Sequence, residues 1–168
     1  MNISIIRGDI SLMEADAIVN AANESLLGGA GVDGAIHRAA GAELLDYCRT
    51  LNGCATGGAK ITPAFNLKAR YIIHAVGPVW RGGNDNEEKL LAECYRQSLA
   101  LAIKYECRSI VFPCISTGVY RFPKQKAAQI ALNSISLFFA NHCSPMRVAI
   151  CVFDDENLVI YKNLLGKK

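Results

Sequence analysis

Apolar and polar residues alternate along this chain with two periods, one typical of strands and one typical of helices. Short stretches rich in β-branched residues end at glycine, proline or polar residues, which predicts strands. Longer stretches repeat apolar residues at helical spacing, as Leu91, Cys94 and Tyr95 do, which predicts helices with one buried face. The expected strands are residues 3–7, 17–20, 59–62, 71–76, 109–113 and 147–153, and the expected helices are residues 34–40, 43–49, 86–105, 124–142 and 157–164.

This order of elements predicts an α/β fold with helices on both faces of a sheet. A length of 168 residues is typical of one domain, so we expect residues 1–168 to form a single domain. In such folds, ligands bind outside the carboxyl ends of the strands. The polar loops at residues 8–9, 20–34 and 114–122 are therefore candidate parts of a site. Asn84, with Glu87 three residues later, indicates a capping box before the third helix.

Composition narrows the class of protein without naming a ligand. Apolar residues make up 51% of the chain, charged residues 20%, and the net charge is +3. This balance is ordinary for a globular protein, and it is too weakly basic to indicate a nucleic-acid protein. The apolar runs are too short to cross a bilayer, and the N-terminal residues lack the pattern of a signal peptide. We therefore expect a soluble, cytoplasmic protein that does not bind membranes.

The seven cysteines form no C-x-x-C pair, and no histidine lies at a zinc-finger spacing from them. Most lie in apolar stretches, so we expect reduced thiols in the core and no metal site. Cys48 and Cys54 lie in a more polar stretch and are expected to be partly exposed.

Gly29, Gly31 and Gly34 spell G-x-G-x-x-G, the fingerprint of dinucleotide-binding folds. The context does not fit a dehydrogenase, because eight residues separate the expected strand end at Asn20 from Gly29, and because this is the second expected strand. The glycines still allow backbone N–H groups to approach a phosphate at a helix start. The loop at residues 116–120 has the same character. Together the two loops indicate a diphosphate held between backbone N–H groups; alternatively, both are tight turns.

Five motifs occur in the order found in macrodomains: residues 8–11, 20–23, 28–41, 74–78 and 116–120. The sequences of two of these motifs, GVDGAIHRAAG and ISTGVY, resemble those of the MacroD-type ADP-ribosyl hydrolases and are especially similar to bacterial O-acetyl-ADP-ribose deacetylases. The resemblance covers nearly the whole chain. It implies a three-layer α/β/α fold with a mixed central sheet, and a cleft that binds ADP-ribose. It also implies hydrolysis of ADP-ribose esters without a metal or an organic cofactor.

The resemblance also implies roles for individual residues. Asp9 and the backbone of Ile10 match the adenine site, where Phe153 is a candidate for stacking; a turn cap and the edge of the core are the alternatives. Asn23 matches a residue that binds the distal ribose and takes part in catalysis. The remaining matches are Gly31, Val32, Ser116, Thr117, Gly118, Val119 and Tyr120 around the diphosphate and distal ribose.

Asp33 matches the catalytic acid of the family. A carboxylate beside the anomeric carbon orients or deprotonates water, stabilises positive charge, or holds the ribose hydroxyls. These roles stay open, as does a helix-terminal aspartate favoured by the helix dipole. Asn20 and His37 are expected to be structural, each bonding loop backbone, with a general base as the alternative role of His37. His74 is expected to face the core.

Two residues depart from the pattern of the family. Ala30 interrupts a glycine run, which would cost about 1 kcal/mol if its backbone were left-handed. Arg121 stands where a glycine is usual, and we hypothesise that it affects turnover more than affinity for ADP-ribose.

Three functions fit the sequence. The leading one is a monomeric hydrolase that removes ADP-ribose from acidic residues of mono-ADP-ribosylated proteins, or deacetylates O-acetyl-ADP-ribose. The others are a non-catalytic ADP-ribose reader and an ADP-ribose 1″-phosphate phosphatase. ADP-ribosylated nucleic-acid ends are further candidate substrates.

Overall fold

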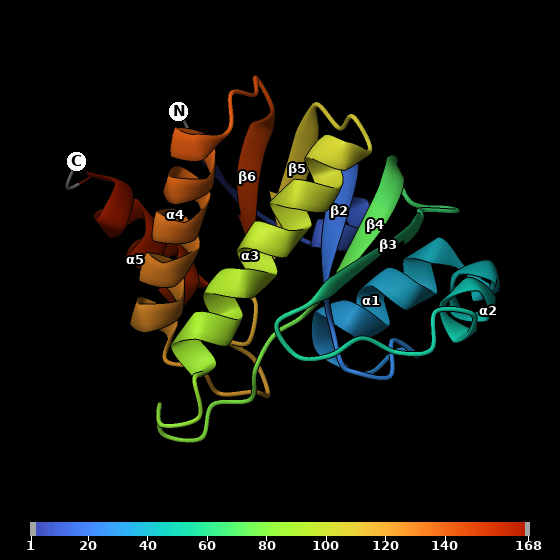
Figure 1. The fold of residues 1–168 in the computed structure, drawn as a ribbon, viewed down its shortest axis with the longest axis horizontal. Coiled ribbons are helices and arrows are strands. Elements are labelled where there is room, and N and C mark those ends of the chain that lie inside the picture. Colours follow the sequence, from blue (N-terminus) through green and yellow to red (C-terminus); the bar gives the residue numbers. More distant parts are fainter. Residues whose placement is uncertain (1–2, 167–168) are drawn as a thin grey trace.

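The computed structural model describes residues 3–166 and is built around a six-stranded sheet in the order β1-β6-β5-β2-β4-β3 (Figure 1). Neighbouring strands run parallel except β3, which pairs antiparallel with β4 at one edge. The mixed sheet is thus confirmed. The strands are β1 (Ile3–Arg7), β2 (Ala15–Ala22), β3 (Ala59–Pro63), β4 (Ala69–Val76), β5 (Ser109–Phe112) and β6 (Arg147–Val152).

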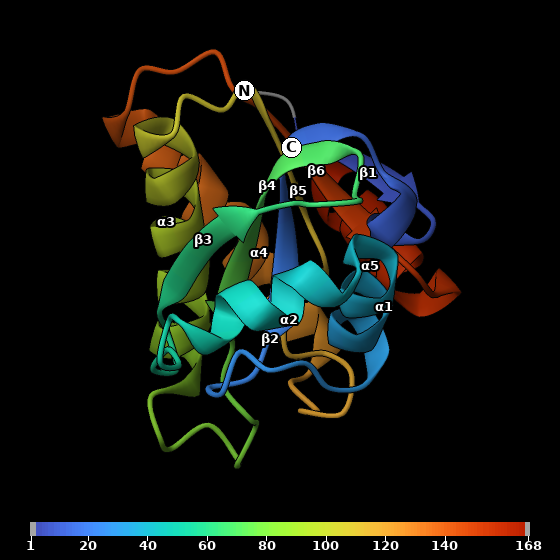
Figure 2. The same ribbon diagram turned by 90° about the vertical axis from the view of Figure 1, so that its right-hand side faces the viewer.

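Helices cover both faces of the sheet, so the three-layer prediction is also confirmed (Figures 1 and 2). On one face lie α1 (Gly31–Ala40), α2 (Ala42–Arg49) and the short 3-10 helix η1 (Ile10–Leu12). On the other face lie α3 (Glu87–Lys104), α4 (Lys124–Asn141) and α5 (Asp155–Gly166). Within residues 3–166, no helix has the length and apolar character that crossing a membrane requires.

Alternation along β2 shows why the sheet has two cores. Val19 packs with Leu91 and Tyr95 on the α3 and α4 side, while Ile18 packs with Ile36 and the rest of the α1 and α2 side. Successive residues of a strand point to opposite faces, so a strand covered on both sides needs apolar residues throughout.

Three local predictions need correction. Helix α1 begins at Gly31 rather than Gly34. The capping box at Asn84 is wrong, because α3 begins after Asn86 and Glu87 accepts from backbone N–H groups of the preceding loop instead. Cys48 is fully buried on the inner face of α2, whereas Cys54 is partly exposed as expected. All seven cysteines are free thiols.

The parallel strands end at the same edge of the sheet, which lies at the bottom of Figure 1. Strands β2 and β5 are neighbours, but the chain leaves β2 toward α1 on one face and leaves β5 toward α4 on the other. Such a divergence opens a crevice between the two connecting loops.

Candidate active site

A cleft runs across this edge between the loop after β2 and the loop after β5. It comprises two cavities, of about 450 and 240 Å³, whose linings share Gly31, Val32, Cys114 and Gly118. The larger cavity extends to Asp9, Ile10 and Phe153 beyond β1 and β6, and we call it the inner cavity. The smaller extends to Asn23, Asp33 and Tyr120, and we call it the distal cavity.

The loop after β2 delivers the start of α1 to the cleft. Gly31 takes a left-handed backbone (φ +60°), and the N–H groups of the first turn have no partner inside the helix. Gly34 must lack a side chain, because a Cβ there would lie 2.6 Å from the Gly29 carbonyl oxygen. Ala30 is extended (φ −94°, ψ 178°), so its methyl group causes no backbone strain.

The loop after β5 presents a second set of donors. Among residues 3–166, the backbone N–H groups of Gly118, Val119 and Tyr120 make no hydrogen bond. Thr117 differs, since its N–H and its hydroxyl both donate to the Cys114 carbonyl, at 3.3 and 2.9 Å. The two loops therefore face each other with unpaired N–H groups, an arrangement suited to an anion.

Asp33, in the first turn of α1, is the buried carboxylate of the distal cavity, with 4% of its surface exposed. Asn20 Nδ2 donates to Asp33 Oδ1 at 2.8 Å, and His37 Nε2 lies 3.4 Å from the same oxygen. Burial raises the pKa of Asp33, and the Asn20 hydrogen bond and the nearby His37 oppose that rise. A carboxylate with a raised pKa is a better proton acceptor than an exposed one.

A chain of buried side chains supports Asp33 from below. Asn20 Nδ2 also donates to His74 Nδ1 (3.1 Å), so the His74 proton is on Nε2, 3.0 Å from Thr62 Oγ1. Burial, reinforced by His37, lowers the pKa of His74 to about 3. A neutral His74 with its proton on Nε2 accepts at Nδ1, which is compatible with an Asn20 amide that donates to both His74 and Asp33.

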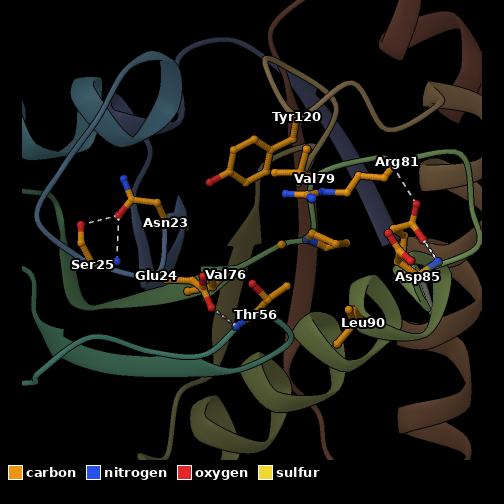
Figure 3. A pocket seen from close by; sticks show the side chains of 13 residues that line it. Asn23, Glu24, Ser25, Thr56, Val76, Val79, Arg81, Asp85, Leu90 and Tyr120 are labelled. Atoms are coloured by element: carbon orange, nitrogen blue, oxygen red, sulfur yellow. Dashed lines mark hydrogen bonds between the residues drawn. The ribbon is translucent and has the colours of Figure 1, made fainter.

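A third cavity, of about 580 Å³, opens beside the distal cavity, and we call it the outer groove (Figure 3). The two share Asn23, Gly77 and Tyr120. In Figure 3 the Tyr120 side chain lies between Asn23 and the loop that follows β4. The outer groove thus continues the cleft toward solvent past the distal end.

Comparison with known proteins decides the family. The family model described as "Macro domain" matches residues 19–131. The chain belongs to the macrodomain family. Its matched segment includes both cleft loops and Asp33.

Some relatives of this macrodomain carry the names of enzymes. It is 50% identical to the O-acetyl-ADP-ribose deacetylase of Cronobacter sakazakii over 98% of this chain and 94% of that protein. It is 54% identical to the human ADP-ribose glycohydrolase MACROD2 over 98% of this chain but 39% of that protein. The Trypanosoma brucei macrodomain in complex with ADP-ribose superposes with a TM-score of 0.91 at 43% identity, covering 98% of this chain and 69% of that one.

The structure gathers every residue that the sequence assigned to ligand binding along the cleft of this macrodomain. The inner cavity is lined by Asp9, Ile10, Thr117 and Phe153, the distal cavity by Asn23, Asp33, Ser116, Val119 and Tyr120, and both by Gly31, Val32 and Gly118. Their individual roles stay predictions. No group of three His, Cys, Asp or Glu side chains within the described chain could hold a metal ion.

Two of these residues already make local hydrogen bonds. Asp9 Oδ1 accepts from Ser11 N–H (2.9 Å) and Ser11 Oγ (2.7 Å), while Oδ2 makes no hydrogen bond within residues 3–166. Asn23 Nδ2 donates to the Gly28 carbonyl (3.0 Å), and its Oδ1 accepts from Ser25. Each residue therefore shapes its own loop and still borders a cavity.

The partners predicted from the sequence are wrong for two polar residues of the site. Asn20 bonds Asp33 and His74 rather than loop backbone, and His37 contacts Asp33 rather than loop backbone. The only signal in the sequence was a polar residue inside an apolar strand, as at Asn20 and His74; the latter faces the core as expected.

Cys114 lines both cavities of the cleft, but its thiol is a poor nucleophile. Burial raises its pKa to about 12, so the thiol stays protonated at neutral pH.

Proposed function

We propose that this macrodomain hydrolyses ADP-ribose esters, removing ADP-ribose from acidic residues of mono-ADP-ribosylated proteins and deacetylating O-acetyl-ADP-ribose. The observation that carries the proposal is the position of Asp33. It is a buried carboxylate with a raised pKa at the far end of a cleft with unpaired backbone N–H groups on both sides. The named activities of the two relatives support the same conclusion.

ADP-ribose would bind along the cleft with its adenine in the inner cavity. There Asp9 Oδ2 accepts from the exocyclic amine, the Ile10 backbone lies beside the ring, and Phe153, 78% exposed, stacks on its face. The N–H groups of Gly31 and Val32 and those of Gly118 to Tyr120 hold the diphosphate between them. This order brings the distal ribose to Asn23, Asp33 and Tyr120.

Asp33 then positions a water molecule toward the anomeric carbon. The water oxygen forms the new bond as the bond to the departing carboxylate breaks, and the proton of the water passes to Asp33 and then to solvent. Asn20 donates to Oδ1 of Asp33 and thereby keeps the carboxylate in a fixed orientation. In this scheme Asn23 holds the ribose hydroxyls, and the two cradles supply binding energy that fixes the anomeric carbon.

The test is a substrate panel with free ADP-ribose as the readout. We expect the wild type to release ADP-ribose from a protein carrying Glu-linked ADP-ribose, and Asp33→Ala to lose about 10²- to 10⁴-fold in rate. Asp46→Ala, which removes an exposed carboxylate, is the matched control and should keep the wild-type rate. Full release by Asp33→Ala would remove Asp33 from this role.

The same panel separates the alternatives. Binding without any release by the wild type would indicate a reader, and faster release of phosphate from ADP-ribose 1″-phosphate than of acetate from O-acetyl-ADP-ribose would indicate a phosphatase. An ADP-ribosylated nucleic-acid end is included as a further substrate.

A further inference from the structure

The outer groove has no part in the binding scheme above, although it adjoins the place where the reaction would occur. It shares Asn23 and Tyr120 with the distal cavity, so it begins where the distal ribose would end. Its volume of about 580 Å³ exceeds what an acetyl group fills. A larger group attached to the distal ribose would leave the cleft through this groove.

The loop from β4 to α3, residues 77–86, forms the wall of the groove, and the Glu87 carboxylate holds it in shape. Glu87 is 1% exposed and accepts N–H groups from Arg81 (2.9 Å), Gly83 (2.8 Å) and Asp85 (2.6 Å). Burial raises the pKa of Glu87, but these hydrogen bonds lower it more, to about 2. The loop is therefore wound around a charge that stays ionised.

The same wall is joined to the loop after β5. Trp80 N–H donates to the Tyr120 carbonyl at 2.8 Å, and the Trp80 ring packs on Phe122 with centroids 4.8 Å apart. A Cβ on Gly83 would lie 2.9 Å from the Trp80 ring. The backbone of Arg81 is thus held in a fixed position relative to Tyr120.

Arg81 is the cation of the groove. Its side chain extends from the wall toward Tyr120 in Figure 3, and it makes no hydrogen bond or ion pair with the described residues 3–166. The lining also carries Glu24, Asp85 and Glu87. The Glu87 carboxylate already accepts the loop N–H groups, so Glu24 and Asp85 are the carboxylates that would repel a polyanion. A peptide with a single carboxylate would instead pair that group with Arg81 and present its backbone N–H groups to Glu24 and Asp85.

We infer that the outer groove binds the acceptor segment of an ADP-ribosylated protein, and that Arg81 pairs with a carboxylate of that segment. The inference rests on the proposed function and extends it to the protein part of the substrate. A guanidinium forms paired, planar hydrogen bonds with a carboxylate, which a lysine does not reproduce. Arg81 is therefore a residue that determines which acceptor sequence is preferred.

Two conjugates test this inference. Both are peptides with one ADP-ribosylated glutamate, followed by a single aspartate in one and by a single asparagine in the other. Affinity is measured with the full chain carrying Asp33→Ala, so that binding is read without turnover, and free ADP-ribose checks that each variant is folded. We expect the acidic conjugate to bind about two- to fivefold more tightly than the neutral one, with the difference shrinking as salt increases.

Adding Arg81→Gln should abolish this preference, and Arg81→Lys should retain part of it. Arg108→Gln is the matched control, because it removes an equal charge at the other end of the sheet, and it should keep the preference. The inference is overturned if the preference for the acidic conjugate is unchanged after Arg81→Gln, or if the chain carrying only Asp33→Ala shows no such preference. Tighter binding of an ADP-ribosylated oligonucleotide than of the acidic peptide, lost with Arg81→Gln, also overturns it and assigns the groove to nucleic acid.

The outcome is separable from the proposed function. Loss of the preference after Arg81→Gln, together with no release of ADP-ribose from either conjugate by the wild type, would uphold the groove and refute the hydrolase. If the wild type releases ADP-ribose from both conjugates, but the two conjugates bind with equal affinity, the hydrolase would be upheld and the groove refuted.

Discussion

The loops after β2 and β5 offer unpaired N–H groups to the same cleft, but different interactions hold them in shape. The first loop places its left-handed backbone at glycines such as Gly31, with the exception of Leu26, and rests on the buried chain of Asp33, Asn20 and His74. The second carries its left-handed backbone at Ser116 and Arg121, and it is closed by bonds from Thr117 to Cys114 and from Phe122 to Ser116. Similar sets of unpaired N–H groups can therefore be built on a helix start or on an irregular turn.

This contrast has a physical consequence. The first loop is fixed by close backbone packing and buried polar groups, so changes there should affect folding as well as binding. The second loop is closed by hydrogen bonds between its own residues, so substitutions there should leave the rest of the fold largely intact.

The largest expected effect comes from Gly34→Ala. Its Cβ would meet the Gly29 carbonyl at 2.6 Å, so we expect a loss of about 3 kcal/mol in the free energy of unfolding and at least tenfold weaker ADP-ribose binding. Gly118→Ala in the second loop is the control, because its Cβ would have nothing within 4 Å. Urea unfolding and calorimetry measure both, and equal destabilisation by the two substitutions would remove the contrast.

His74 should give the next largest effect, as a dependence of stability on pH. The unfolded state takes up a proton below about pH 6.5, but the folded state does so only near pH 3, so His74 contributes stability above 6.5 that is lost as pH falls. Between pH 8 and pH 5 the loss is about 2 kcal/mol.

His74→Gln should flatten this part of the pH profile, whatever it does to absolute stability. His142→Gln, at an exposed histidine, should leave the slope unchanged. Denaturant unfolding at pH 8, 6.5 and 5 gives both slopes, and identical slopes for wild type and His74→Gln would contradict the neutral, buried His74.

A smaller effect is expected for Asp33→Asn. Burial raises the pKa of Asp33, so its contribution to stability is present below the ordinary aspartate value and is lost as pH rises through the raised one. The amide should therefore be more stable at neutral pH, by less than about 2 kcal/mol, while activity falls. Thermal unfolding at pH 7.5 and pH 4 tests the sign: a stabilisation that grows toward pH 4 would refute it.

Arg121→Gly should have the smallest effect. Arg121 has φ +59°, a conformation that costs a side chain about 1 kcal/mol and glycine little. The fair comparison is with Arg121→Ala, which loses the same side chain but keeps the strain, and Arg121→Gly should be the more stable by up to about 1 kcal/mol. Turnover and ADP-ribose affinity of the pair, measured together, test whether Arg121 affects turnover more.

Most strands and helices could be predicted from the sequence, because these elements depend on local periodicity. The first strand is observed at its predicted bounds, residues 3–7, and most other elements differ by one to three residues at their ends. The prediction of a capping box at Asn84 was wrong, because the Glu87 carboxylate accepts backbone N–H groups of the preceding loop instead. The path of that loop in three dimensions decides this.

The sequence by itself determined the strand and helix pattern, the placement of the loops at one sheet edge, and the macrodomain resemblance that pointed to Asp33. Only the tertiary structure decided that Asn20 and His74 support Asp33, that Ala30 is unstrained, and that Arg81 enters a groove beside Tyr120. The physical reason is distance along the chain. Periodicity reports a residue's immediate neighbours, whereas burial, pKa shifts and hydrogen-bond partners come from segments that the sheet brings together.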